Sequence, residues 1–274
     1  MVPSLLILTD FFGAAVKALD YATNLAAPLA ARLVLLHVRR DSILDPERFT
    51  GALHNLNSEA IKVTFNSLAK DLSVPIVSEV GHGRVVDAVA DAVSRHRPTF
   101  VVLGRPDTGP VPDELVSTTS LELLRAAPYP MLVVPHAIHA AHPPRRLLLA
   151  VDGEPFALGE HALVLSQVLR ALKAELTVLH VAEESQHLGA STAALDSVLH
   201  AGVLVDKPQT IRTRSVVAPH PAEGILQTAQ AVEFDMVVLI ARRRSVWGQL
   251  FHQSVTAQVL LHSTLPVLVL PAQE

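Results

Sequence analysis

The sequence contains no cysteine and few aromatic residues. Of its 274 residues, 50% are hydrophobic but only 4% are Phe, Trp or Tyr. The absence of cysteine excludes disulfides, thiolate metal ligands and cysteine nucleophiles. The shortage of aromatic residues means that the core is built mainly from Leu, Val, Ile and Ala, a composition typical of parallel sheets covered by helices.

Strong net charge and long apolar runs are missing as well. The formal net charge of −4 gives no general attraction to nucleic acid or to an anionic membrane. No apolar run approaches the roughly 18 residues of a membrane helix. The first short run has no basic residue before it and ends at Asp10, unlike a secretory signal. We therefore expect a cytoplasmic protein without a nucleic-acid or membrane partner.

The sequence does contain an internal repeat. Residues 100–135 (FVVLGRPDTGPVPDELVSTTSLELLRAAPYPMLVVP) and 236–271 (MVVLIARRRSVWGQLFHQSVTAQVLLHSTLPVLVLP) share one pattern. Each has an apolar run, a polar loop, a Ser/Thr-led helix pattern and a second apolar run ending in proline. The copies lie 136 residues apart at both ends, so no residue is gained or lost between them.

Two shorter echoes extend the repeat upstream. LLILTD (5–10) matches LLLAVD (147–152), and ARLVLLHV (31–38) matches AELTVLHV (174–181), at offsets of 142 and 143 residues. The chain is therefore predicted to be a tandem repeat of one domain. Because the offset falls to 136, the second copy is predicted to be shorter by 7 residues between Val181 and Met236.

Each copy is predicted to alternate five strands with four helices. The predicted strands are 4–8, 33–38, 74–80 and the two apolar runs of the 100–135 unit in the first copy, and 147–151, 176–181, 210–217 and the two runs of the 236–271 unit in the second. In the first copy, one helix is predicted after Gly13, one within 45–72, one after Gly83 and one before Pro130. In the second copy, the predicted helices are one at about 155–172, one that includes Leu195 and Leu199, one around 225–232 and one before Pro266.

This alternation predicts an α/β fold of two tandem, doubly wound, five-stranded parallel-sheet domains that are Rossmann-like. We expect the domains at 1–139 and 145–274, with the proline-containing stretch 136–144 linking them. The apolar runs 131–134 and 267–270 would be exposed sheet edges, which invite pairing unless they are covered. The two domains are therefore predicted to form an intramolecular pseudo-dimer through their fifth strands.

Ligands of such sheets bind beyond the carboxyl ends of the strands, where the winding direction reverses, here between strands one and four. That rule places Asp10 with the loop after Leu103 in one copy, and Asp152 with the loop after Leu239 in the other. His37 and His180 end the second strands beside this cleft. No nucleophile accompanies them, so we interpret them as hydrogen-bonded strand-end histidines. The histidines of the linker have no acidic or cysteine co-ligand, and no metal site is expected.

At this point the sequence resembles a known family. The TDF start, the LLHV and VLHV strands and the final stretch QSVTAQVLLHSTLPVLVLP (253–271) are similar to universal stress proteins in their tandem, two-domain form. The resemblance covers essentially the whole chain. It implies a fold like that of the adenine nucleotide alpha hydrolases, with fifth strands that pair antiparallel. It also implies a homodimer of chains as a further assembly, and protein partners whose identity the sequence does not reveal.

Family members that bind ATP carry, after strand four, a glycine, two residues, a glycine, nine residues, and a glycine followed by Ser or Thr. Glycines let the backbone approach phosphates, and a helix N-terminus attracts them. The matching positions of the first copy are Gly104, Asp107, Ser117 and Thr118. Its loop also carries two further acids and two prolines, so we expect this copy to suit ATP poorly.

The matching positions of the second copy are Ile240, Arg243, Gln253 and Ser254, so all three glycines are missing. Three consecutive arginines, 242–244, nevertheless supply positive charge, and Ser254 can cap the helix. We therefore expect any ATP, ADP or AMP site in this copy, with Asp152 near the ribose or base and the Val181 backbone near the adenine. The candidate nucleotide-binding residues are Asp152, Val181, Arg242, Arg243, Gln253 and Ser254, and in the first copy Asp10, Val38, Gly104, Ser117 and Thr118.

Simpler interpretations of these residues stay open. Ser117, Thr118 and Ser254 cap helices in any case, and the arginines fit a solvated loop. The leading hypothesis is a non-enzymatic stress-response protein that acts through partners and has degenerate nucleotide loops. The alternative is a family member that binds ATP or AMP and hydrolyses ATP slowly. An adenylyl-transfer enzyme would need a His/Gly-rich motif near the first turn, which the residues from Asp10 to Gly13 do not form.

Overall fold

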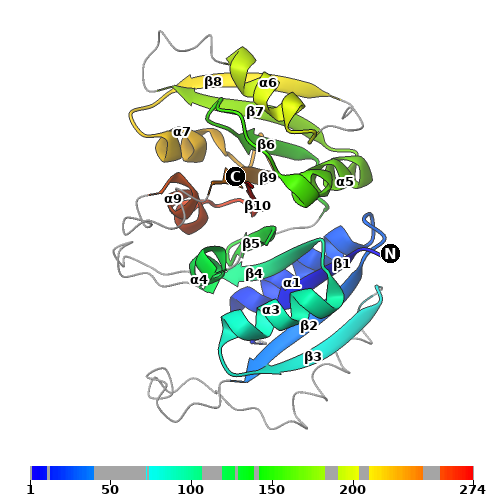
Figure 1. The fold of residues 1–274 in the computed structure, drawn as a ribbon. Coiled ribbons are helices and arrows are strands. Elements are labelled where there is room, and N and C mark those ends of the chain that lie inside the picture. Colours follow the sequence, from blue (N-terminus) through cyan, green and yellow to red (C-terminus); the bar gives the residue numbers. More distant parts are fainter. Residues whose placement is uncertain are drawn as a thin grey trace.

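The strands of both halves join in one ten-stranded sheet in the computed structural model. The structure describes residues 2–10, 13–39, 72, 74–106, 119–126, 129–138, 142–182, 191–203, 210–242 and 254–273. The strands are β1 (Ser4–Leu8), β2 (Arg32–Arg39), β3 (Ile76–His82), β4 (Phe100–Arg105), β5 (Met131–Pro135), β6 (Arg146–Ala150), β7 (Glu175–Ala182), β8 (Ile211–Val217), β9 (Met236–Ala241) and β10 (Val267–Pro271). Their order in the sheet is β3-β2-β1-β4-β5-β10-β9-β6-β7-β8 (Figure 1).

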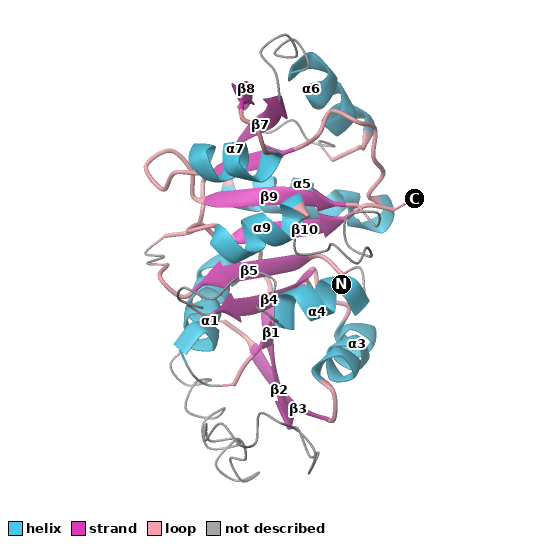
Figure 2. Ribbon diagram, turned by 90° about the vertical axis from the view of Figure 1, so that its left-hand side faces the viewer, coloured by secondary structure: helices cyan, strands magenta, loops and turns pink. Residues whose placement is uncertain are grey.

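Helices cover both faces of this sheet. The described helices are α1 (Gly13–Ala26), α3 (Val85–His96), α4 (Thr119–Ala126), α5 (Ala162–Leu172), α6 (Ser191–His200), α7 (Pro221–Thr228) and α9 (Val255–His262). Buried residues of α1, α5 and α6 form one core with one face of the strands. Residues of α3, α4, α7 and α9 form the other core, and Figure 2 shows α7 and α9 in front of the strands. The α/β, doubly wound prediction is confirmed.

The two halves meet through their fifth strands, as predicted. All other strand pairs are parallel, but β5 and β10 run antiparallel, with Val133 opposite Val267 and Met131 opposite Val269. Every residue of both strands is buried. The apolar edges that would otherwise invite aggregation therefore cover each other.

The structure also locates the difference in length between the halves. Leu33 pairs with Ile76, which is 43 residues further on, whereas the equivalent Leu176 pairs with Ile211, which is 35 residues further on. The second half is therefore shorter between its second and third strands, inside the predicted interval. Most of both connections, including the predicted helix within 45–72, lies outside the described residues.

Three predicted boundaries were wrong. The helix expected from about Pro155 begins at Ala162, after a short 3-10 turn η3 (Gly159–His161). The cause is a backbone bridge in which the Gln273 amide donates to the Ala157 carbonyl at 2.7 Å and keeps this stretch extended.

The second wrong boundary is the C-terminus of α7. This helix ends at Thr228 rather than near Val232, since the Gln230 side-chain amide donates to the carbonyls of Leu226 and Gln227. Third, the strand predicted at 74–80 is β3, which spans Ile76–His82 and so continues through Gly81 and His82. A side chain at Gly81 would lie 2.8 Å from the Ala88 Cβ, so this glycine allows α3 to pack closely on the strand.

Candidate functional site

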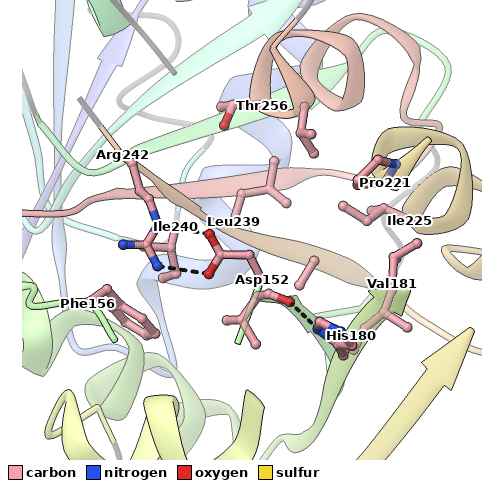
Figure 3. Close-up of a pocket in the computed structure, with 14 residues that line it drawn as sticks. Asp152, Phe156, His180, Val181, Pro221, Ile225, Leu239, Ile240, Arg242 and Thr256 are labelled. Carbon is pink, nitrogen blue, oxygen red and sulfur yellow. Dashed lines mark hydrogen bonds and ion pairs between the residues drawn. The ribbon is translucent and has the colours of Figure 1, made fainter. Parts of the chain in front are cut away.

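A pocket opens at the point in the second half where the chain reverses its winding direction. The strand β6 pairs with β7 on one side and with β9 on the other, so the carboxyl ends of these strands leave a crevice between them. The cavity has a volume of about 240 Å³ (Figure 3). Its lining comes from strand ends and from two helices: Ala150, Val151, Asp152, Phe156, Leu179, His180, Val181, Pro221, Ile225, Leu239, Ile240, Arg242, Val255 and Thr256.

Most of this lining is apolar. Leu179 and Leu239 form a floor of strand residues that are almost fully buried. Pro221 and Ile225 come from the first turns of α7, and Val255 from the start of α9. A lining of this kind favours a flat, apolar group such as a heteroaromatic ring.

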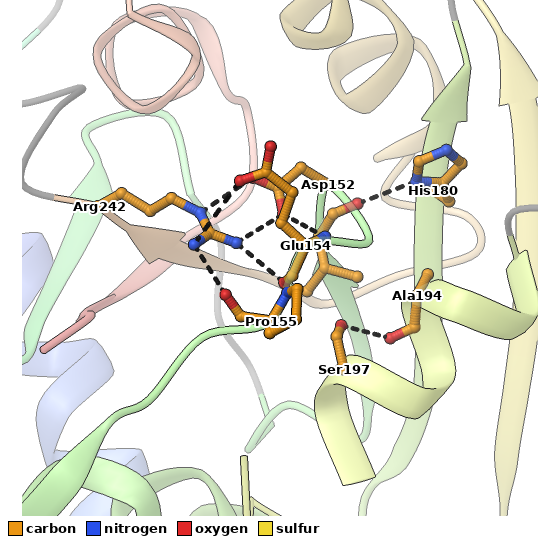
Figure 4. Close-up of polar contacts among 8 residues, drawn as sticks. Asp152, Glu154, Pro155, His180, Ala194, Ser197 and Arg242 are labelled. Carbon is orange, nitrogen blue, oxygen red and sulfur yellow. Dashed lines mark hydrogen bonds and ion pairs between the residues drawn. The ribbon is translucent and has the colours of Figure 1, made fainter. Parts of the chain in front are cut away.

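The opposite wall of the pocket is ionic. The Arg242 guanidinium donates to both carboxylate oxygens of Asp152, from Nε at 3.0 Å and from Nη2 at 2.8 Å. It also donates to the backbone carbonyls of Glu154 at 2.9 Å and Pro155 at 3.0 Å (Figure 4). A planar guanidinium suits this two-pronged contact with a carboxylate. Arg242 therefore ties the loop after β6 to the end of β9.

The Asp152 carboxylate also organises its own loop. Its Oδ1 accepts a hydrogen bond from the Glu154 amide at 3.0 Å, and Gly153 between them adopts a positive φ of 82°. The Asp152 side chain is 50% exposed, whereas that of Arg242 is 20% exposed. The carboxylate thus remains in contact with solvent at the mouth of the pocket, where a polar ligand group can reach it.

The strand-end histidines behave as predicted. His37 Nδ1 lies 2.9 Å from the Thr9 carbonyl oxygen, and His180 Nδ1 lies 3.4 Å from the equivalent Val151 carbonyl oxygen. Each ring bridges the ends of the first two strands of its half. His180 is buried and also forms part of the pocket wall.

Two helix N-termini face this region. Ser254 caps α9, because its side-chain oxygen accepts a hydrogen bond from the Ala257 amide at 3.1 Å. The first two residues of α9, Val255 and Thr256, line the pocket. The second helix, α7, begins with Pro221, whose fixed φ suits a first helical position.

In the first half, the first helix packs closely on the strands at the equivalent place. α1 starts at Gly13, only three residues after Asp10, and packs against β4 and β5. A Cβ atom at Gly104, near the end of β4, would overlap the backbone carbonyl of Ala14. The missing side chain at Gly104 thus admits the first turn of α1.

The structure brings together part of the predicted site. Asp152, Val181 and Arg242 line one pocket, and Ser254 caps the helix that completes it. In the first half, Asp10 is exposed and Val38 is half-buried near the end of β2. Four predicted positions lie outside the described residues: Ser117, Thr118, Arg243 and Gln253.

Sequence reasoning missed several of the residues that line the pocket, among them Phe156, Pro221, Ile225 and Thr256. Pro221 and Thr256 were recognisable in principle, since both stand at helix starts on the carboxyl edge of the sheet. Phe156 was not recognisable, because the sequence predicts a helix from about residue 155, where the structure has an extended loop.

Two further observations concern the described part of the chain. Among the described residues, no group of three or more His, Cys, Asp or Glu side chains could hold a metal ion. In the same part of the chain, no helix is both long and apolar enough to cross a membrane.

These features define a class: paired, doubly wound α/β domains, with a pocket at the switch point of the second domain. The model of the universal stress protein family matches the chain twice, over residues 1–135 and 144–271. The chain therefore belongs to the universal stress protein family, in its tandem form.

Individual relatives are distant. Universal stress protein Rv1996 of Mycobacterium tuberculosis is 29% identical over 118 residues, which are 43% of this chain and 37% of that protein. The crystal structure of a universal stress protein from Archaeoglobus fulgidus has a TM-score of 0.68, 17% identity and 98% coverage of both chains. A functionally unknown protein, PA1789 from Pseudomonas aeruginosa, has a TM-score of 0.62 and 18% identity, over 99% of this chain and 93% of its own. At these identities the two structures support the fold alone.

Proposed function

We propose that this chain is a non-enzymatic stress-response protein that acts through protein partners, and that only its second half binds an adenine nucleotide. The observation that carries the proposal is the pocket at the carboxyl ends of β6, β7 and β9, with an apolar floor and an ionic wall. A nucleotide has the same division into an apolar ring and a polar, charged remainder.

The ring fits the apolar side of the pocket. Leu179, Val181 and Leu239 offer strand residues below it, and Ile225 offers a side chain from α7. The Val181 backbone, near the end of β7, can supply hydrogen bonds to the polar edge of an adenine. Asp152, half exposed at the mouth, can accept hydrogen bonds from ribose hydroxyls.

The size of the cavity limits how much of the ligand is buried. Its volume of about 240 Å³ lies below the roughly 300–1,000 Å³ of pockets that enclose drug-sized ligands. The phosphates would extend past the mouth, toward Arg242 and the α9 N-terminus that Ser254 caps. Three arginines precede that cap in the sequence and carry positive charge. Without the motif glycines, fewer phosphates are favoured, so we expect AMP or ADP to bind better than ATP.

A non-enzymatic role is supported by what the ionisable groups at the pocket do. The Asp152 carboxylate holds Arg242 and the Glu154 amide, and the His180 ring lies against the Val151 carbonyl. Both side chains thus hold strand ends and loops together, as a binding scaffold requires.

Isothermal titration of the full chain with AMP, ADP and ATP tests the proposal. We expect one site per chain, and we expect Arg243→Ala to weaken binding by about 1–3 kcal/mol through loss of a charge contact. Ser254→Ala should weaken it as well, whereas Asp10→Ala, in the first half, should leave it unchanged. Tight ATP binding that survives Arg243→Ala and Ser254→Ala but is lost in Asp10→Ala would place the site in the first half and contradict the proposal. Phosphate release during the ATP titration would favour the slowly hydrolysing alternative.

A further inference from the structure

An arginine of the first half holds a helix of the second half. Arg105, the last residue of β4, extends across the junction of the two halves. Its Nη1 donates to the carbonyl oxygens of Leu260, at 2.8 Å, and Leu261, and its Nη2 donates to the Ser263 carbonyl at 2.7 Å. These three carbonyls belong to the last turn of α9 and its C-cap.

The contact meets a specific need of that helix. The last carbonyls of any α-helix lack partners within the helix, and this end carries partial negative charge. One guanidinium, planar and with several donors, satisfies three such carbonyls at once. α9 has only eight residues, so its two caps contribute a large share of its local stability.

The helix that Arg105 holds is also the helix that completes the pocket. Val255 and Thr256, in its first turn, line the cavity. α9 also packs against α7, which contributes Pro221 and Ile225 to the same lining. A shift of α9 therefore moves four lining residues on one side of the pocket.

The counterpart position in the second half cannot make the same contact. In the parallel ladders, Arg105 stands opposite Pro135 in the first half, and Ala241 stands opposite Pro271 in the second. Ala241 is thus the counterpart of Arg105, and its methyl side chain cannot donate hydrogen bonds to α4 in return. At this position the first half thus supports the half that contains the described pocket.

We propose that the first half positions the pocket of the second half through Arg105, a positioning residue that fixes α9 by its C-terminus. Loss of Arg105 loosens α9, and through it α7, without altering any residue that contacts the ligand. A binding experiment on this role rests on the proposed nucleotide site, whereas hydrogen exchange of the unliganded chain does not.

Hydrogen exchange of the unliganded full chain tests the positioning itself. In Arg105→Met we expect amides of α9 and α7 to exchange roughly 5- to 100-fold faster than in the wild type, because buried helix carbonyls lose their donors. Arg105→Lys, which keeps one charged donor group, should show an intermediate increase. Ile7→Val, a truncation in the core on the other face of the sheet, is the matched control and should leave both helices unchanged. Unchanged exchange in α9 of Arg105→Met would overturn the proposal.

Titration with AMP provides the functional readout. We expect Arg105→Met to weaken binding by about 3- to 30-fold and Arg105→Lys to restore part of the loss, while Ile7→Val binds like the wild type. Wild-type affinity in Arg105→Met, despite faster exchange of α9, would show that the contact serves stability alone and would overturn the positioning role. If the wild type binds no nucleotide, the proposed function fails, and the exchange result still decides whether Arg105 positions α9.

Discussion

The two halves of the chain place an arginine at neighbouring positions at the end of equivalent strands and use it differently. Arg105 ends β4 and reaches into the other half, where it holds α9. Its counterpart is Ala241, and the next residue, Arg242, folds back within its own half onto Asp152. The residue before the loop in the first half is instead Pro106. A shift of one position thus distinguishes Arg105, which caps a helix of the other half, from Arg242, which forms an ion pair beside the pocket of its own half.

The neighbouring residue shows a second divergence. Gly104 lets the backbone of α1 pack on β4, whereas its counterpart Ile240 lines an open pocket. The helix that follows the first strand starts at Gly13 in one half, but only at Ala162, after an extended loop, in the other. The end of β4 is thus packed against a helix and the end of β9 lines a pocket, although the strands of the two halves share one order and register.

The largest effect that we predict comes from filling the close contact in the first half. Gly104→Ala places a methyl group against the Ala14 carbonyl, and backbone cannot move aside as a side chain can. We expect the free energy of unfolding to fall by about 3 kcal/mol, at the upper end of the usual cost of overpacking. Urea denaturation at pH 7 measures it.

A substitution at Ile240, the counterpart of Gly104, tests the same position in the second half. Ile240→Ala removes a partly exposed side chain beside an existing cavity, so we expect a smaller loss of stability than for Gly104→Ala. If Gly104→Ala were as stable as the wild type, α1 would not be packed on β4 as described, and the contrast between Gly104 and Ile240 would fail.

A middle-sized effect concerns pH. Asp235 precedes β9, and its carboxylate accepts hydrogen bonds from the Arg145 and Arg146 amides, both at 2.9 Å, and from the Arg146 guanidinium at 2.5 Å. Partial burial would raise the pKa of this carboxyl, but the hydrogen bonds from Arg146 and Arg145 outweigh burial and hold its pKa below the ordinary value. Its equivalent in the first half is Thr99, which has no charge and whose amide donates to Ser4 as that of Asp235 does to Arg146.

A carboxyl whose folded-state pKa is depressed stabilises the fold above its unfolded-state pKa, near pH 4. That contribution is lost as the pH falls through the folded-state value. We therefore expect Asp235→Asn to lower the free energy of unfolding by about 2 kcal/mol at pH 7. Below about pH 4, where the wild type loses this contribution, the stability of the variant should fall less steeply than that of the wild type. Thermal unfolding across that range measures both effects. The matched variant Thr99→Val should keep the wild-type pH profile, and an unchanged profile in Asp235→Asn would contradict the assignment.

The fold could be predicted from the sequence because its signals are repeated. The apolar runs that became β4 and β5 recur 136 residues later as β9 and β10, so each strand was supported by two copies of one pattern. Parallel sheets buried on both faces demand such runs, and exposed apolar edges demand a partner, so the pairing of β5 with β10 followed from general rules. The antiparallel direction of that pairing was implied by the family resemblance.

The site was only partly predictable, because its geometry depends on packing. Asp152 and Arg242 were identified individually, but their ion pair depends on the conformation of the loop after β6, which the bridge between Ala157 and Gln273 holds extended. Arg105 could not be recognised at all, since its partners are carbonyls more than 150 residues away that carry no side-chain signal. Local periodicity contains no information about such contacts.

The smallest effect that we predict breaks the clamp that distinguishes the second half. Arg242→Met should lower the free energy of unfolding by only about 1 kcal/mol, because the Asp152 carboxylate is half exposed and solvent screens the pair. The Glu154 amide, bonded to that carboxylate, should exchange faster as the loop loosens. Screening also predicts that the loss shrinks between about 10 mM and about 500 mM salt, since the Debye length falls well below the size of the site. Urea unfolding at both salt concentrations checks this, with Pro106→Ala at the equivalent position expected to show no such salt dependence. A loss that is equally large at both concentrations would mean that Arg242 acts through packing of its aliphatic stem rather than through its charge.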